Sequence, residues 1–106
     1  MKIHPTIATF VKAKNDRDTT AVVTCFADDA VVHDEGQEMR GLVAIKEWSE
    51  KSFRKYQYTI EPTNLREEGD KTVLTATLTG NFPGSPVSLD FNFTIRGDKI
   101  IALLID

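Results

Sequence analysis

The segment FADDAVVHD, residues 26–34, lies where a helical sequence pattern gives way to strands. Before it, Ile7, Phe10 and Val11 recur at helical spacing, and Pro5 suits a first helical turn, where its missing N–H costs nothing. The sequence therefore predicts an N-terminal helix with one apolar face, followed by a change of structure inside this segment.

A second helix and a short strand are expected on either side of the two aspartates of the segment. Asp18 or Thr19 can cap a helix that contains Phe26 and ends near Asp28. The apolar residues that follow predict a strand over 30–34, closed by the Glu-Gly turn after it.

A third helix is predicted after Gly41, and strands follow it to the end of the chain. Leu42, Ile45, Trp48 and Phe53 form a helical stripe. From residue 58 onward, alternating apolar and polar residues are separated by turn sequences at residues 68–71, 83–86 and 96–99. This order predicts an α+β protein with three N-terminal helices packed on one face of the sheet.

The alternation in the later strands assigns their two faces. Phe91 and Phe93 are expected to face the helices, which turns Asp90 outward. The last strand is apolar on both faces, with Ile101, Leu103 and Ile105 on one side and Ile100, Ala102 and Leu104 on the other. A strand covered on both faces predicts a homodimer through the outer sheet face.

Composition limits the class of protein. A chain of 106 residues fits a single domain, residues 1–106. Cys25 is the only cysteine, which favours a cytoplasmic location, and the absence of a long apolar run predicts no membrane span. The net charge is -3, and Lys12 and Lys14 are interpreted as part of a solvated helix face. We therefore expect no nucleic-acid partner.

The FADDA phrase, the strand after it, and Arg40-Gly41 before a helix carrying Ile45 and Trp48 resemble the nuclear transport factor 2-like superfamily. Within it, the chain is similar to the SnoaL-like family, which is related to polyketide cyclases and ketosteroid isomerase. The resemblance implies a cystatin-like cone, with the three helices on the concave face of a curved, mostly antiparallel sheet. It also implies a pocket between the sheet and the helices.

Comparison with ketosteroid isomerase implies a role for one residue and argues against two others. Asp34 falls on the position of that enzyme's carboxylate base, whereas Phe10 falls on the position of its oxyanion-binding tyrosine and cannot donate a hydrogen bond. Asp90 lies close to the position of the second oxyanion donor, but the hydrophobic register turns it outward. Ketosteroid isomerisation is therefore disfavoured.

The expected site is an apolar pocket with one carboxylate. Asp34 is the expected general acid/base, because a carboxyl group in an apolar pocket has a raised pKa. Two interpretations stay open for Tyr56 and Tyr58, a hydroxyl at the pocket mouth or a solvent-exposed side chain. The hairpin at residues 81–86 is interpreted by default as a purely structural turn, with the border of the pocket entrance as the alternative. The expected ligand-binding residues are aromatic or aliphatic: Phe10, Phe26, Trp48, Phe53, Phe82, Phe91 and Leu103.

Two functional classes follow from these residues. The first is an isomerase, cyclase or dehydratase that acts without a cofactor on a small apolar or carbonyl-bearing molecule. The second is a non-catalytic ligand-binding or dimerisation module of the same fold. His4, His33 and Cys25 lack the spacing of a metal site, so we expect no metal.

Overall fold

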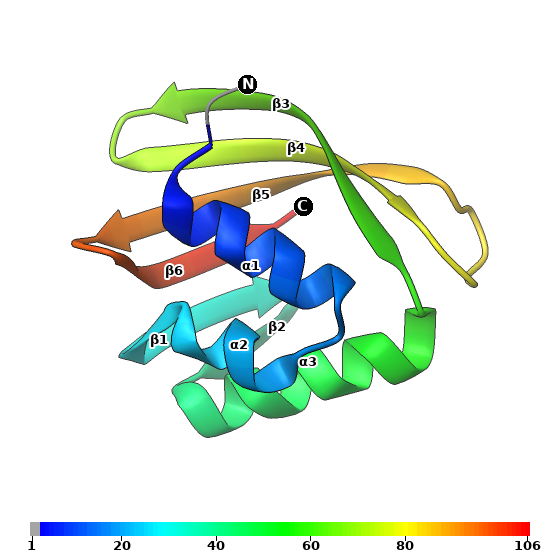
Figure 1. The fold of residues 1–106 in the computed structure, drawn as a ribbon, viewed down its shortest axis with the longest axis horizontal. Coiled ribbons are helices and arrows are strands. Elements are labelled where there is room, and N and C mark those ends of the chain that lie inside the picture. Colours follow the sequence, from blue (N-terminus) through cyan, green and yellow to red (C-terminus); the bar gives the residue numbers. More distant parts are fainter. Residues whose placement is uncertain (1–2) are drawn as a thin grey trace.

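The computed structural model describes residues 3–106, which form three helices and one six-stranded sheet (Figure 1). The helices are α1 (Pro5–Asn15), α2 (Thr19–Thr24) and α3 (Leu42–Tyr56). The strands are β1 (Phe26–Asp34), β2 (Gln37–Arg40), β3 (Thr59–Glu68), β4 (Lys71–Thr79), β5 (Val87–Arg96) and β6 (Lys99–Ile105).

The sheet is mostly antiparallel and runs in the order β2-β1-β6-β5-β4-β3. The strands from β3 to β6 are joined as consecutive hairpins, and β1 pairs in parallel with β6. In Figure 1, α1 and α2 lie over one face of the curved sheet, and α3 lies beside β1 and β2. The predicted α+β class and the three-helix cover of a curved sheet are confirmed.

The helix starts follow from local capping. His4 Nδ1 accepts a hydrogen bond from the Thr6 backbone N–H at 3.1 Å, and the Asp18 side chain accepts one from Ala21 N–H. Gly41 precedes α3 with a φ of 87°, a left-handed conformation that suits glycine. The predicted starts of α1 and α3 are thereby explained.

The segment around the two aspartates differs from its prediction. The second helix ends at Thr24 instead of near Asp28, and Phe26 already belongs to β1. Phe26 is buried and pairs with Ile100 of β6, so its long-range packing outweighs the local helical pattern.

A short strand, β2, was not predicted. Its four residues are mostly polar and exposed, and it pairs antiparallel with the end of β1, placing Gln37 opposite Asp34. Its sequence carries no apolar alternation, because an edge strand of this kind depends on its neighbour rather than on burial.

The registers of β4 and β5 confirm the predicted faces. Leu74 lies opposite Phe91 in the core, whereas Thr75 lies opposite Asp90 on the outer face. The grouping of the last strand was wrong at one residue. The β5–β6 register shifts between Thr94 and Ile95, and this bulge places Ile100 in the core instead of beside Leu104 on the outer face.

No helix within residues 3–106 has both the length and the apolar character needed to cross a membrane.

Candidate functional site

Asp34 is the last residue of β1 and is half-buried beside α3. Its Oδ2 accepts a hydrogen bond from the Trp48 indole Nε1–H at 2.9 Å. Burial raises the pKa of the Asp34 carboxyl, and the Trp48 hydrogen bond opposes that rise. The carboxyl group is therefore desolvated and held in one orientation, and its raised pKa is suitable for a group that exchanges a proton with a ligand.

A cavity of about 230 Å³ opens beside Asp34. One wall comes from α3 and the residues that follow it, a second from the inner face of the sheet, and a third from the link between β4 and β5. The lining residues are Asp34, Glu35, Ser52, Tyr56, Tyr58, Leu78, Phe82, Pro83, Val87, Leu89, Phe91 and Ile105. A mostly apolar wall with a few polar groups is typical of a small-molecule site.

The β4–β5 link contributes its aromatic wall because the backbone approaches the end of α3 closely. A Cβ atom on Gly80 would lie 2.8 Å from the Tyr56 carbonyl oxygen and from Tyr58, so the approach requires glycine. Asn81 N–H donates to the Tyr56 carbonyl at 2.9 Å, and the Phe82 ring meets the Tyr56 ring at 5.7 Å. The hairpin, for which a purely structural turn was the default interpretation, thus supplies Phe82 and Pro83 to the lining.

Tyr56 and Tyr58, for which a place at the pocket mouth and exposure to solvent were both open, line the cavity in different states. The Tyr56 hydroxyl donates a hydrogen bond to the exposed Glu35 carboxylate, which Lys55 also approaches at 3.9 Å. Tyr58 is 7% exposed, and burial raises the pKa of its phenol. Tyr58 therefore stays protonated and can donate a hydrogen bond to a ligand oxygen.

Of the residues predicted to bind a ligand, Phe82 and Phe91 line the cavity together with Asp34. Trp48 reaches the site through its N–H, while its side chain lines a separate surface hollow between α3 and β2. The rest of the set lies outside the lining: Phe10, Phe26 and Leu103 are packed in the core, and Phe53 is half-buried against it.

The core position of Phe10 has a direct physical reason. Its ring makes edge-on contacts with Phe26 at 6.0 Å and with Phe93 at 5.4 Å. These aromatic residues fill the space between α1 and the sheet with their own side chains, so the cavity forms beyond them, toward the β4–β5 link.

The neighbouring histidine points away from the site, as its place in an extended strand predicts. His33 lies opposite Leu104 of β6, and its Nε2 is 3.8 Å from the exposed Glu38 carboxylate. Over residues 3–106, no three His, Cys, Asp or Glu side chains are grouped as metal ligands.

Lys14 overturns the prediction that it lies on a solvated helix face. Its side chain is 1% exposed, whereas Lys12 on the same helix is in solvent and pairs with Asp16. The spacing of Ile7, Phe10, Val11 and Lys14 is i, i+3, i+4, i+7, so this lysine continues the buried stripe. That spacing was the signal by which the sequence could have revealed it.

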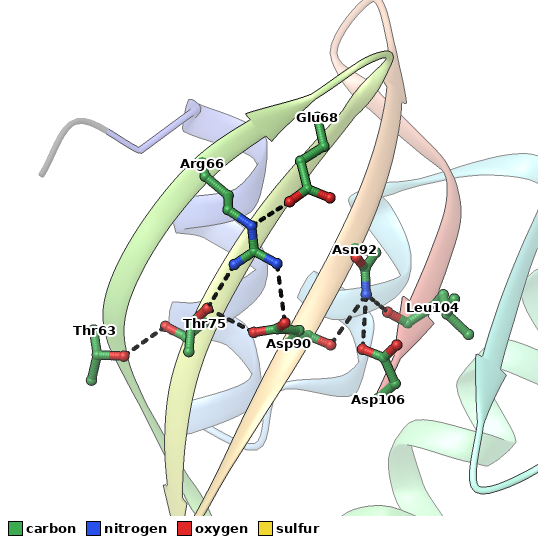
Figure 2. A network of polar contacts seen from close by, with 8 residues as sticks. All are labelled: Thr63, Arg66, Glu68, Thr75, Asp90, Asn92, Leu104 and Asp106. Carbon is green, nitrogen blue, oxygen red and sulfur yellow. Dashed lines mark hydrogen bonds and ion pairs between the residues drawn. The ribbon is translucent and has the colours of Figure 1, made fainter.

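Asp90 lies on the opposite, outer face of the sheet, as predicted (Figure 2). Thr75 Oγ1 donates a hydrogen bond to it at 2.7 Å, and Arg66 pairs with it at 3.2 Å. These two contacts lower the pKa of the Asp90 carboxyl. It therefore takes no part in the cavity.

Comparison with known proteins agrees with this geometry. The family model for the SnoaL-like domain matches residues 7–103. A crystal structure of a candidate polyketide cyclase from Sinorhizobium meliloti is 38% identical, with a TM-score of 0.94 over 98% of this chain and 95% of that one. No protein with a curated description matches the chain in sequence.

More distant structures share the fold. One, from Catenulispora acidiphila, has a ketosteroid isomerase-like fold and was solved in complex with trimethylamine; it is 20% identical, with a TM-score of 0.86 over 99% of this chain and 86% of that one. A cystatin-fold protein from Novosphingobium aromaticivorans is 19% identical, with a TM-score of 0.80 over 100% of this chain and 98% of that one.

Proposed function

Because the chain belongs to the SnoaL-like family, we propose that it binds a small apolar or carbonyl-bearing molecule beside Asp34 and moves a proton on it without a cofactor. The observation that carries this proposal is the placement of one desolvated carboxylate, held by Trp48, at the wall of an otherwise apolar cavity. The structurally similar protein from Sinorhizobium meliloti, named as a candidate cyclase, supports the same class of chemistry.

The proposed step uses two groups of the cavity wall. The Asp34 carboxylate takes a proton from a carbon next to a carbonyl, and the C–H electron pair moves toward the carbonyl oxygen. The Tyr58 hydroxyl donates a hydrogen bond to that oxygen as its negative charge grows. Asp34 then returns the proton to another carbon, which isomerises the molecule, or to a departing hydroxyl group, which dehydrates it.

Tyr58 supplies the hydrogen-bond donor to the ligand oxygen that Phe10 cannot supply. Its hydroxyl belongs to a residue of the cavity lining, and burial keeps the phenol protonated. The site thus contains a base and a hydrogen-bond donor, although neither Phe10 nor Asp90 contributes.

The test uses cyclohexanone as the probe and follows exchange of its α-protons for deuterium by NMR in D₂O. We expect the wild-type protein to accelerate exchange and Asp34→Asn to reduce that acceleration by ~10²–10⁴-fold, the usual contribution of a general base. Asp90→Asn is the matched control, because it removes a carboxylate from the outer face of the same sheet.

Equal exchange by the two variants would exclude Asp34 as the base. A cyclohexanone-dependent rise in melting temperature without exchange in the wild type would instead assign the cavity to binding alone. Asn at position 34 can still accept the Trp48 hydrogen bond, so the variant isolates the loss of basicity from a loss of structure.

We also propose that two copies associate through the outer sheet face. Leu104 lies there on β6, 41% exposed, next to Ala102 along the same face. Light scattering coupled to size exclusion should give twice the chain mass for the wild type and the single-chain mass for Leu104→Lys, because a buried charge opposes association. A wild-type mass equal to one chain at micromolar concentration would exclude the dimer.

A further inference from the structure

The amine of Lys14 is buried in the middle of the fold. The side chain is 1% exposed, and within residues 3–106 its Nζ has no hydrogen-bond partner. Burial lowers the pKa of this amine to about 7, and the negative charge of Asp34 opposes that change. Lys14 can therefore gain or lose its proton near neutral pH.

Three aromatic rings surround the amine. Lys14 Nζ lies 4.2 Å from the centroid of the Trp48 ring, 4.7 Å from that of Phe53 and 5.4 Å from that of Tyr58. These distances are within the range in which an ammonium is attracted to the face of a ring. We call Trp48, Phe53 and Tyr58 the aromatic box.

Trp48 connects this box to the candidate base. Its ring lies against Lys14 Nζ, and its Nε1–H donates to Asp34 Oδ2 at 2.9 Å. One indole is thus held between a cation and an anion. The other charged or titratable groups around this cluster are Glu35 after β1, Lys55 of α3, Arg17 after α1 and the phenol of Tyr58.

Stability of the fold does not account for a lysine at this position. A buried amine without a hydrogen-bond partner is costly, and an apolar side chain of similar length, such as methionine, would fill the same stripe of α1 at less cost. Destabilising groups of this kind are concentrated at functional sites.

We propose that Lys14 is a positioning residue of the Asp34 site: its ammonium, held against the Trp48 ring, keeps the indole N–H on Asp34 and favours the ionised carboxylate. This role rests on the proposed function of Asp34 as a base. It also extends that function, because a cation against the Trp48 ring stabilises the carboxylate form of Asp34, which is the form that takes a proton.

Trp48 is the only tryptophan, so its indole N–H gives a single NMR signal that reports on both neighbours. The experiment follows this signal in ¹⁵N-labelled protein from pH 4 to 9, without any ligand. All proteins carry His33→Gln, so that the signal changes do not include a contribution from the imidazole next to Asp34 in the chain.

In the reference protein we expect two steps, one at acidic pH from Asp34 and one near pH 7 from Lys14. Lys14→Met should remove the step near neutrality and move the Asp34 step to higher pH. Asp34→Asn should remove the acidic step and move the Lys14 step to lower pH. Lys12→Met, on the exposed side of the same helix, should match the reference protein.

An Asp34 step that stays in place in Lys14→Met would overturn the proposal, whether or not the neutral step is lost. A Lys14 step unchanged in Asp34→Asn would overturn it as well, which keeps the test valid if one variant fails to fold. Because no ligand is present, the result is separate from the exchange experiment. Failure of cyclohexanone exchange removes the proposed function, whereas failure of the titration removes only the role of Lys14.

Discussion

The two faces of the sheet hold similar groups in opposite environments. On the inner side, Asp34 and Lys14 are desolvated and are connected through the indole of Trp48. On the outer side, Asp90 and Arg66 form a direct ion pair that is exposed in the single chain, within the network drawn in Figure 2. The pKa of Asp34 is raised by burial, whereas that of Asp90 is lowered by the Thr75 hydrogen bond and by Arg66.

Both faces of the sheet carry a carboxylate and a cation, so residue type alone does not identify the candidate functional site. The desolvation of the inner pair distinguishes it. The outer network also includes Asn92, whose side-chain amide donates to the Leu104 carbonyl at 2.9 Å and to Asp106 (Figure 2). Its polar groups satisfy one another at the surface, so they are suited to fixing strand register. The inner groups are left with unmet charge and hydrogen-bonding capacity, which a ligand or a proton can use.

The largest stability change that would test this comparison is expected from Lys14→Met. An amine with a pKa of about 7 when folded and 10.5 when unfolded is protonated mainly in the unfolded state between those values. Stability of the wild type should therefore rise with pH across this window. This shift in pKa sets an upper limit of about 5 kcal/mol on the stability that Lys14→Met gains at pH 7. Loss of the contacts between the ammonium and the aromatic box reduces that gain by about 1–2 kcal/mol.

Urea unfolding at pH 7 and at pH 9.5 measures this effect. We expect Lys14→Met to be the more stable protein at pH 7 and to lack the rise toward pH 9.5. The upper pH stays below the range in which the raised pKa of the Tyr58 phenol would make stability fall. Lys12→Met should change little at either pH, and a Lys14→Met protein less stable than wild type at pH 7 would contradict the inner-face assignment.

Periodic patterns were sufficient to predict most of the fold and the orientation of Asp90, whereas the place of Asp34 at the pocket was predicted from the family resemblance. Alternation along β5 placed Phe91 inward and Asp90 outward, and extended geometry placed His33 on the side opposite Asp34. These predictions succeed because a one-residue slip in a half-buried strand would expose its whole apolar set.

The predictions failed where long-range contacts outweighed the local pattern. Phe26 joins β1 because it pairs with Ile100, and the bulge near Ile95 turns Ile100 into the core. The boundary of the cavity could likewise not be predicted from the sequence. Side-chain volume, and not periodicity, decides that Phe10 fills the core while Phe82 lines the opening. Lys14 was misassigned because its charge was weighted above its place in the helical stripe.

The smallest expected effect compares the two carboxylates themselves through Asp34→Asn and Asp90→Asn. Asp90 has a lowered pKa when folded, so its stabilising contribution is present above its unfolded pKa of 3.8 and is lost as pH falls through the folded value. Because the Arg66 pair is exposed to solvent, its loss should reduce stability only slightly at pH 7.

Asp34 has a raised pKa when folded, so stability falls as pH rises from 3.8 through the folded value. Asp34→Asn removes that fall. As the pH rises from 3 to 7, the stability of Asp90→Asn should therefore fall relative to that of the wild type. The stability of Asp34→Asn should rise relative to that of the wild type over the same range. Thermal unfolding of the three proteins at these two pH values tests the opposite signs. If the stabilities of both variants change in the same direction relative to the wild type, the carboxylates of the two faces do not differ in desolvation. The outer network could then not be distinguished in this way from a site that exchanges protons.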